Sequence, residues 1–348
     1  MGFNEELLGL FETEMGDMAQ LTQLSGDLRN KVVTIYGDNG TGKTTQVSRL
    51  SKLGYSVVFI SLEKGLNAIS GVMNIGVKTY ADITKVVKKL TSKKFTQMLD
   101  KEPIIIVWDG IENLKTLAEN YVCSQAGVDK VKEGNSGYGL WEEYRKALSD
   151  VIVPILDERY TTIFICHPEI ITETVNKKKV PVGVDLGCEK RLKKILKDNS
   201  DFILYLENNE DEDGEELNSI AYSRPSNGIK ARSRFSHFPP CFEFTAENLI
   251  EGLSQAVEKQ AKEEDVKVVD AQTQQMVYGK ENEESFEEIL EDVKNILANV
   301  EQDTREEEMV FDLLDKTFGM GVSLSDLTQK NKEALMVFRD EIIDILAL

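Results

Sequence analysis

The stretch that decides the fold is Gly37-Asp38-Asn39-Gly40-Thr41-Gly42-Lys43-Thr44-Thr45. Residues 31–36, directly before it, are mostly apolar and β-branched, a pattern that predicts a buried strand. Residues 45–50, directly after it, carry apolar side chains at helical spacing. The pattern therefore predicts a glycine-rich turn that leads from a strand into a helix.

This glycine-rich turn fits G-x-x-x-x-G-K-[ST], the pattern called the P-loop. Glycines let the backbone curl so that successive N–H groups point at phosphate oxygens, and the positive end of the helix dipole lies at the same place. In such a loop the Lys43 ammonium is expected to reach the β- and γ-phosphates of ATP, and the Thr44 hydroxyl to ligate Mg²⁺. All nine residues of the stretch are therefore expected to bind the nucleotide.

The composition is that of an ordinary globular protein. The chain has 348 residues, of which 41% are hydrophobic and 29% are charged, and it has no run of about 18 apolar residues that would predict a membrane span. Its first residues lack the basic and apolar regions of a secretory signal, so we expect a cytoplasmic protein. Four scattered cysteines and two histidines disfavour a zinc site.

The net charge of −20 is unevenly distributed along the chain. Residues 251–348 carry 10 Lys and Arg against 25 Asp and Glu, a net charge of −15, which leaves −5 for residues 1–250. A strongly acidic protein is normally a poor ligand for nucleic acid. Because the front part of the chain is close to balanced, the total charge does not exclude a nucleic-acid partner.

Apolar runs alternate with amphipathic stretches after the P-loop, which predicts a mostly parallel sheet with helices on both faces. The expected strands cover residues 55–62, 103–109, 161–166 and 201–206, with a return strand over 217–223 after an acidic turn. The expected helices of this part cover residues 81–99 and 140–158. The fold class is therefore α/β.

Changes in composition divide the sequence into four expected parts. They are an N-terminal helical segment (1–27), a nucleotide-binding domain (28–257), a charged linker (258–284) and an acidic helical C-terminal module (285–348). Helices of the module are expected near 285–298, 305–318 and 325–347, with Ser325 as the N-cap of the last one.

Three polar residues follow predicted strands, whose carboxyl ends meet at one side of a parallel sheet. Asp109 is expected to hold Mg²⁺ through water, with Glu112 as an alternative acid. Glu63 is placed either to polarise an attacking water or to serve as a solvated or capping side chain. His167 is placed either to contact the γ-phosphate or to act as a hydrogen-bonded loop histidine.

Residues 173–197 form the only strongly basic region of the sequence. Its cations are Lys177, Lys178, Lys179, Lys190, Arg191, Lys193, Lys194 and Lys197. Such a segment would bind nucleic-acid phosphates, or it would be a solvated face, which is what charge runs usually are. It lacks aromatic residues that would stack on bases.

Lys230 and Arg232 are spaced so that both side chains lie on one edge if their segment is extended. Two cations presented together on a loop would neutralise charge on a phosphoryl group, in their own site or in that of a neighbouring subunit. A plain pair of surface cations is the alternative.

The order of these features resembles that of the RecA-like recombination ATPases, and most of all the compact phage-encoded AAA-type relatives of RecA. The resemblance covers about residues 28–250, and the residues that carry it are 37–45, 59–66, 104–109, Tyr138, Gly139, Trp141, 163–167 and 230–232. It implies a RecA-like P-loop core, with a mostly parallel sheet flanked by helices, over residues 28–257. For a phage-encoded member it implies the host cytoplasm as the location.

The resemblance also implies roles for individual residues. Glu63 would be the catalytic acid or base, and Lys230 and Arg232 would act on the ATP of an adjacent subunit in a ring or filament. The loop after His167 would touch single-stranded DNA. The sequence departs from RecA at His167, where RecA has glutamine, and its acidic C-terminal module has no counterpart there. That module would bind a protein partner or screen the DNA site.

Two functions follow as hypotheses. The leading one is an oligomeric, Mg²⁺-dependent ATPase that acts on single-stranded DNA in recombination or repair, with Lys43, Glu63, His167, Lys230 and Arg232 as catalytic residues. The alternative is a P-loop ATPase regulator or adaptor that acts on proteins without contacting DNA. A nucleotide kinase is disfavoured, because the sequence shows neither a separate acceptor site nor an arginine-rich lid.

Overall fold

A computed structural model describes residues 24–63, 69–210, 216–269, 284–300 and 304–346. The larger compact unit lies within Leu21–Met276, and the C-terminal helices belong to a second unit. Most of the predicted N-terminal helical segment and the tip of the acidic turn lie outside the described residues.

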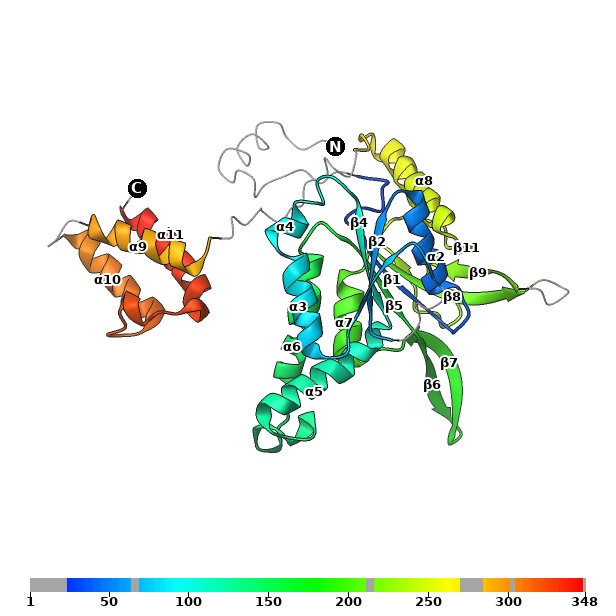
Figure 1. Ribbon diagram of the computed structural model, residues 1–348, viewed down its shortest axis with the longest axis horizontal. Coiled ribbons are helices and arrows are strands. Elements are labelled where there is room, and N and C mark those ends of the chain that lie inside the picture. The colour runs from blue at the N-terminus through cyan, green and yellow to red at the C-terminus, as the bar shows by residue number, and fades with distance from the viewer. Residues whose placement is uncertain (1–23, 64–68, 211–215, 270–283, 301–303, 347–348) are drawn as a thin grey trace. The chain divides into compact units, whose positions relative to one another are not determined.

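Within the described residues, the larger unit is built on a nine-stranded sheet (Figure 1). Its strands lie in the order β11-β9-β8-β1-β5-β4-β2-β3, and β10 pairs with β8. The bounds are β1 Val32–Gly37, β2 Ser56–Ser61, β3 Met73–Gly76, β4 Ile104–Asp109, β5 Thr161–Cys166, β8 Phe202–Glu210, β9 Glu216–Tyr222, β10 Arg232–Ser233 and β11 Cys241–Glu243.

The strands from β3 to β8 in this order are all parallel, whereas β9, β10 and β11 are antiparallel additions. The strand β1 lies between β5 and β8, and β5 separates it from β4. Parallel strands deliver their carboxyl ends to one side of the sheet. We call the ends of β1, β2, β4 and β5, with the residues that directly follow them, the carboxyl rim.

Helices cover both faces of the sheet, as the buried strands predict (Figure 1). Alternate residues of β4 point to opposite faces: Ile106 and Trp108 pack in one core, and Ile105 and Val107 pack in the other. The first core is closed by α3 Tyr80–Leu90, α5 Leu114–Ala126, α6 Trp141–Leu156 and α7 Lys190–Asn199. The second is closed by α2 Lys43–Arg49 and α8 Ala246–Glu264. The expected α/β fold class is confirmed.

The predicted strands and helices of this unit are present. The structure adds elements that the sequence did not predict, namely β3, β10, β11, α7, α8 and a hairpin. The polar stretch after the fourth strand was read as an interruption, but it forms an antiparallel hairpin of β6 Pro168–Val175 and β7 Lys178–Leu186. A short helix, α4 Lys93–Thr96, follows α3. The helix α8 continues past residue 257, where the composition changes, to Glu264.

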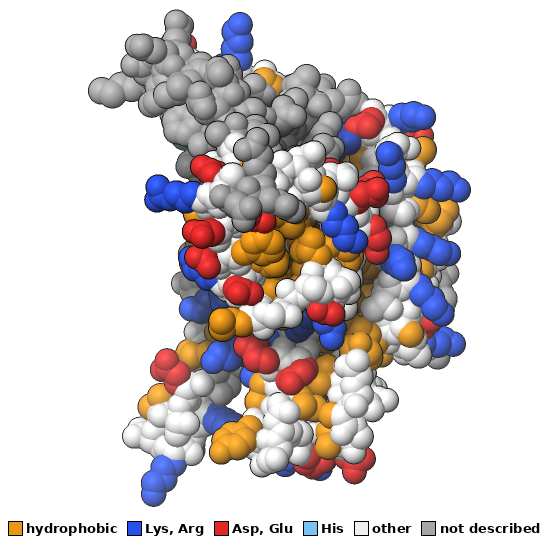
Figure 2. All heavy atoms as spheres, turned by 90° about the vertical axis from the view of Figure 1, so that its left-hand side faces the viewer, with side chains coloured by type: hydrophobic (Ala, Val, Ile, Leu, Met, Phe, Trp, Pro, Cys, Tyr) orange, Lys and Arg blue, Asp and Glu red, His pale blue; other side chains and the backbone are white. Residues whose placement is uncertain are grey.

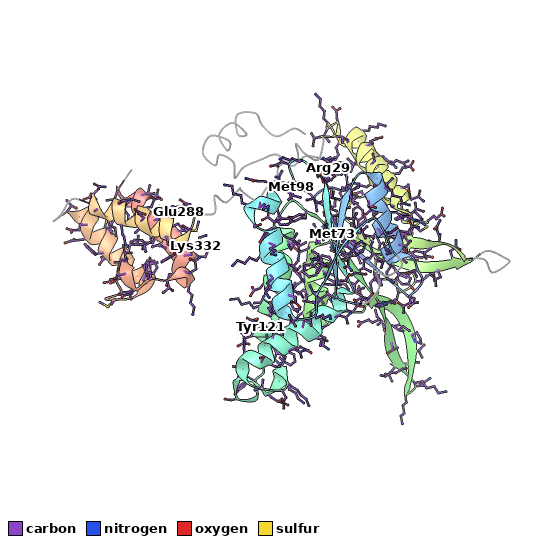
Figure 3. All side chains as sticks on the ribbon, viewed as in Figure 1. Arg29, Met73, Met98, Tyr121, Glu288 and Lys332 are labelled. Carbon is purple, nitrogen blue, oxygen red and sulfur yellow. The ribbon has the colours of Figure 1, made fainter. Side chains whose placement is uncertain are left out.

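The C-terminal unit consists of α9 Phe286–Ala298, α10 Arg305–Phe318 and α11 Lys332–Leu346, which pack around a core of their own. The helix α9 begins with a capping box in which Ser285 and Glu288 bond to each other's backbone N–H groups. These hydrogen bonds, and then the charge of Lys332 at the start of α11, lower the pKa of Glu288 (Figure 3). The last helix begins at Lys332, so the prediction of an N-cap at Ser325 is wrong.

Among the described residues, no helix combines the length and the apolar character that crossing a membrane requires.

Candidate nucleotide-binding site

The predicted loop joins β1 to α2 and has a backbone that only glycine adopts easily. Gly40 and Gly42 have φ angles of 85° and 70°, in the left-handed region. A Cβ atom at Gly37 would lie 2.6 Å from the carbonyl oxygen of Leu206, so no side chain fits there. The sequence therefore needs glycine at Gly40 and Gly42 for the backbone conformation, and at Gly37 for the close approach of Leu206.

Lys43 begins α2, and its side chain folds back over the loop. Its Nζ donates hydrogen bonds to the carbonyl oxygens of Gly37 and Asp38, both at 2.7 Å. Burial of this ammonium lowers its pKa. The cation is therefore held inside the loop by backbone oxygens, at the position from which a phosphate would draw it.

Asp109 ends β4 at the carboxyl rim and is fully buried. Its Oδ1 accepts a hydrogen bond from the Thr44 hydroxyl at 3.3 Å, whereas its Oδ2 is buried with no hydrogen-bond partner among the residues that the structure describes. Burial, and then the nearby charge of Glu63, raise the pKa of Asp109 to about 6. A buried carboxylate oxygen without a partner, beside a hydroxyl, is a donor set that fits Mg²⁺.

Glu63 follows β2 and lies beside the end of β4, where the N–H of Leu62 donates to the carbonyl of Asp109 at 3.0 Å. Its side chain packs against Gly110: a Cβ atom at Gly110 would lie 2.9 Å from Glu63 Cδ. Gly110 also has a φ of 72°, which favours glycine. The missing side chain at Gly110 thus leaves room for Glu63 at the carboxyl rim, where the sequence predicted it.

His167 follows β5 at the same rim and is held from two sides. Its backbone N–H donates to Glu112 Oε1 at 3.2 Å, and its ring Nδ1 lies 2.5 Å from the same oxygen. On the other side, its Nε2 lies 2.7 Å from Oδ1 of Asn39, in the P-loop. Both readings of His167 made from the sequence are therefore compatible with its position, since it is hydrogen-bonded and also touches the phosphate-binding loop.

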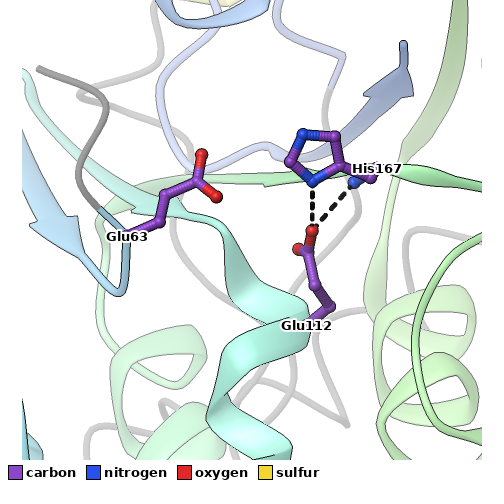
Figure 4. A group of neighbouring side chains, drawn as sticks. All are labelled: Glu63, Glu112 and His167. Carbon is purple, nitrogen blue, oxygen red and sulfur yellow. Dashed lines mark hydrogen bonds and ion pairs between the residues drawn. The ribbon is translucent and has the colours of Figure 1, made fainter. Parts of the chain in front are cut away.

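Glu63, Glu112 and His167 form a close group at the rim (Figure 4). Each offers a ligand atom within 4.8 Å of the others, a spacing that a cation would bridge. Glu112 and His167 already bond to each other, and the oxygens of Glu63 make no bond to either of them. We therefore regard the group as a His–Glu pair with a separate carboxylate rather than as a prepared metal site.

With this geometry in place, the comparison with known families is direct. A family model described as an AAA domain matches residues 29–235. The chain belongs to this AAA-domain family. The match covers the whole carboxyl rim and the hairpin β6–β7, and it ends just after β10.

A relative with a similar length supports the assignment. The SPbeta prophage-derived uncharacterized protein YorG of Bacillus subtilis (strain 168) is 34% identical over 330 residues, which are 94% of this chain and 97% of the relative. The resemblance to phage-encoded AAA-type proteins is thus confirmed.

Likeness to solved structures is weak. An ATPase from the type III secretion system of pathogenic bacteria is 11% identical with a TM-score of 0.34, over 93% of this chain and 86% of that one. The RadB recombinase is 15% identical with a TM-score of 0.35, over 68% of this chain and 94% of that one.

The basic segment does not form one continuous cationic surface. The lysines of α7 are largely paired: Lys197 lies 2.7 Å from Asp185, and Lys193 pairs with Glu169 and Asp185. Further pairs join Lys194 to Asp198 and Arg191 to Glu189. On the face drawn in Figure 2, basic and acidic side chains are likewise interspersed.

Lys190 is exposed at the start of α7, and the hairpin β6–β7 carries the other three basic residues of the segment. Lys177, Lys178 and Lys179 lie at its tip, are exposed, and make no ion pair with any residue that the structure describes. The strands of the hairpin also expose apolar side chains, of which Ile170 is 68% and Val175 is 50% accessible. The hairpin is joined to the rim at its base, where the N–H of Gly187 donates to the carbonyl of His167 at 2.7 Å.

Lys230 and Arg232 differ in their surroundings although they are two residues apart. Lys230 is exposed, and its backbone N–H donates to Val184 of the hairpin at 3.1 Å. Arg232 begins β10 rather than lying on a loop, and its Nη2 donates to the carbonyl oxygens of Lys197 and Ser200 at the end of α7. Of these two residues, only Lys230 presents its cation to solvent.

Sequence reasoning missed two parts of the site. Glu112 was considered only as a substitute for Asp109, but it is the partner of His167. Gly110 was not singled out, although it makes room for Glu63. A signal for Gly110 existed, because a glycine directly after a strand often marks a backbone that needs positive φ. The Glu112–His167 pair had no such signal, since 55 residues separate its members.

Proposed function

We propose that this AAA-domain protein binds ATP with Mg²⁺ at the carboxyl rim and hydrolyses it. The observation that supports this most strongly is Asp109, a fully buried carboxylate whose Oδ2 has no partner and whose Oδ1 accepts the Thr44 hydroxyl. A folded protein retains a buried oxygen without a partner only at a cost, which a bound cation would offset. Bound Mg²⁺ would neutralise charge on the phosphates.

The other residues of the rim take roles that fit their positions. Lys43 would exchange the carbonyl oxygens of Gly37 and Asp38 for phosphate oxygens. Glu63, which lies beside Asp109 and bonds to neither Glu112 nor His167, would orient and deprotonate the attacking water. His167 would contact the γ-phosphate, since its ring already touches the P-loop at Asn39.

We propose single-stranded DNA as the effector of this ATPase. The support is the hairpin β6–β7, which begins directly after His167 and carries three exposed lysines at its tip. Loss of the γ-phosphate would shift His167, and the hydrogen bond from Gly187 to its carbonyl would pass the shift to the base of the hairpin. Action in an oligomer is part of the proposal, because Lys230 is free to reach a neighbouring subunit's phosphates.

One observation favours the second candidate function, an ATPase that acts on protein partners. The hairpin strands expose Ile170, Val175, Val180 and Val182, and exposed apolar side chains on a two-stranded ribbon suit a protein surface better than a phosphate backbone. The paired lysines of α7 also reduce the cationic area available to DNA.

The test is phosphate release by the full chain with Mg-ATP, measured alone and with single-stranded oligonucleotide over a range of salt concentrations. The DNA reading predicts that turnover rises with oligonucleotide and that binding weakens steeply with salt. Turnover that oligonucleotide leaves unchanged would refute DNA as the effector and favour the protein-partner function. Absence of Mg-ATP uptake in calorimetry would refute the nucleotide site itself.

A further inference from the structure

We propose that Glu112 is a positioning residue, whose carboxylate holds the His167 ring with Nδ1 protonated and Nε2 turned toward the P-loop. The inference concerns the site already proposed for ATP and rests on that function for its catalytic consequence. It assigns a task to a residue that follows Asp109 by three positions and that the ATPase scheme above does not use.

The geometry is a two-point attachment. Glu112 Oε1 receives both the backbone N–H of His167, at 3.2 Å, and the ring Nδ1, at 2.5 Å. A carboxylate that binds the backbone and the ring of one residue fixes the rotation of that ring, because both bonds must be kept together. The ring Nε2 then lies 2.7 Å from Asn39 Oδ1.

The elements that carry the three residues make the arrangement rigid at one end. Glu112 lies in the short helical turn η4 Ile111–Asn113, which follows β4, and the N–H of Gly110 donates to the carbonyl of Ile165 in β5 at 3.1 Å. Glu112 is mostly buried, with 17% of its side chain accessible, and its Oε2 has no hydrogen-bond partner in the described part of the chain. Asn39 is instead an exposed loop residue. A phosphate that approached the loop would therefore displace Asn39 from His167 and leave Glu112 in place.

The chemistry of the pair sets which ring nitrogen carries a proton. A carboxylate only accepts hydrogen bonds, so the nitrogen facing it must be the donor. In water, neutral histidine prefers the proton on Nε2. Glu112 would thus impose Nδ1–H on His167 and aim Nε2 at the nucleotide site, which is the kind of role that second carboxylates play for metal-bound histidines. Asn39 Oδ1 also only accepts hydrogen bonds, so an Nε2 without a proton bonds to Asn39 only when the amide turns its Nδ2 toward the ring.

The decisive measurement is the imidazole ¹⁵N spectrum of the full chain labelled in histidine. The chain has two histidines, so His237→Gln assigns the signals. At mildly alkaline pH we expect His167 Nδ1 to be protonated in the wild-type protein, and Glu112→Ala to shift the proton to Nε2. Glu112→Gln, which keeps the side-chain volume, should give an intermediate spectrum if Glu112→Ala does not fold. Glu251→Ala, an exposed glutamate on α8, is the matched control and should leave the spectrum unchanged.

ATP turnover gives a second test, and its expected result differs from that for a residue that only stabilises the fold. We expect Glu112→Ala to lower kcat about tenfold with little change in KM, and Glu112→Ala combined with His167→Ala to lose no more than His167→Ala alone. Losses that multiply, or a His167 ring still protonated on Nδ1 in the folded Glu112 variants, would overturn the proposal. A chain without any ATP turnover would refute the proposed function, while the ring spectrum would still decide the role of Glu112.

Discussion

The carboxyl rim and the hairpin β6–β7 adjoin at His167, yet their physical character is opposite. The rim keeps two buried oxygens, Asp109 Oδ2 and Glu112 Oε2, for which the described residues offer no hydrogen-bond partner. The hairpin exposes its charges, and among the described residues its three tip lysines have no ion pair. An unpaired buried oxygen costs about 1–3 kcal/mol, whereas an exposed lysine costs almost nothing. The rim therefore has a cost in stability that a bound ligand would offset, whereas the hairpin has almost none. We expect substitutions at the rim to have larger effects than substitutions in the hairpin.

The largest effect is expected for Lys43→Ala. This change removes the only cation that the P-loop holds inside it, so calorimetry with Mg-ATP should show uptake lost or weakened at least about a hundredfold, with turnover lost as well. Lys52→Ala, an exposed lysine just past α2, is the matched control and should bind as the wild type does. Unchanged binding by a folded Lys43→Ala protein would show that the loop does not hold the phosphates.

A large but more selective effect is expected for Glu63→Gln. Glutamine fits beside Gly110 but accepts no proton, so Mg-ATP binding should persist while hydrolysis falls by about 10²-fold or more. Phosphate release under saturating ATP measures this, with Glu251→Gln as the remote control. Hydrolysis at the wild-type rate would move the catalytic role to another acid, and Glu112 would be the next to test.

These two predictions concern residues that the sequence alone placed correctly, and the reason is local. The P-loop pattern fixes its own backbone, because Gly40 and Gly42 adopt conformations that other residues avoid and Gly37 has no room for a side chain. The runs before Glu63 and Asp109 are apolar throughout, which is typical of strands buried on both faces of a parallel sheet. Because β2 and β4 are parallel neighbours, both carboxylates come to the same side of the sheet. The spacing of the P-loop residues and the hydrophobicity of the strands were therefore enough to predict that these residues lie at the carboxyl rim.

The hairpin shows where such reasoning stops. Strands β6 and β7 do contain apolar residues, but Ile170, Val175, Val180 and Val182 are exposed, and only the end of β7, at Val184 and Leu186, packs in the first core. The apolar residues of β7 alternate as in a strand, but the Glu and Lys residues around them and the lack of a buried run made the segment look like a polar interruption. The pairing of α7 lysines with Asp185 and Glu169 was equally hidden, since it depends on how the hairpin meets the helix. Similarly, the burial of Arg232 depends on β10 joining the sheet.

A comparison within the basic segment sharpens the contrast between rim and hairpin. Replacing Lys177, Lys178 and Lys179 together by Ala should weaken binding of single-stranded DNA and reduce the slope of log affinity against log salt by about 2, because three phosphate contacts are lost. The matched triple change of Lys193, Lys194 and Lys197, which are already paired, should alter the slope much less. Fluorescence anisotropy at several salt concentrations measures both. Equal effects would contradict the assignment of DNA binding to the hairpin tip.

The Asp109→Asn variant tests how much the buried Asp109 charge lowers the free energy of unfolding when no ligand is bound. The pKa of Asp109 is raised to about 6, so between about pH 4 and 6 the folded protein keeps a proton that the unfolded chain has lost. The contribution of Asp109 to the free energy of unfolding therefore falls as pH rises through this window, by about 2–3 kcal/mol in all. We expect Asp109→Asn to be more stable than the wild type to urea at pH 7.5 and equally stable below about pH 4. A variant that is less stable at pH 7.5 would show that the buried charge is satisfied without a ligand.

The smallest effects separate Lys230 from Arg232. Arg232→Ala leaves the carbonyl oxygens of Lys197 and Ser200 without their donor, so it should lower the free energy of unfolding by about 1–3 kcal/mol. Lys230→Ala removes an exposed side chain and should change it by less than about 0.5 kcal/mol.

If Lys230 acts on a neighbour's ATP, Lys230→Ala should lower turnover, and mixing this variant with Glu63→Gln subunits should restore part of it, because some interfaces then combine an intact Glu63 with an intact Lys230. When Arg232→Ala subunits are mixed with Glu63→Gln subunits, we expect turnover to recover no further than the fraction of folded Arg232→Ala protein allows. Recovery with neither variant would mean that the two cations act on the ATP of their own subunit or take no part in hydrolysis.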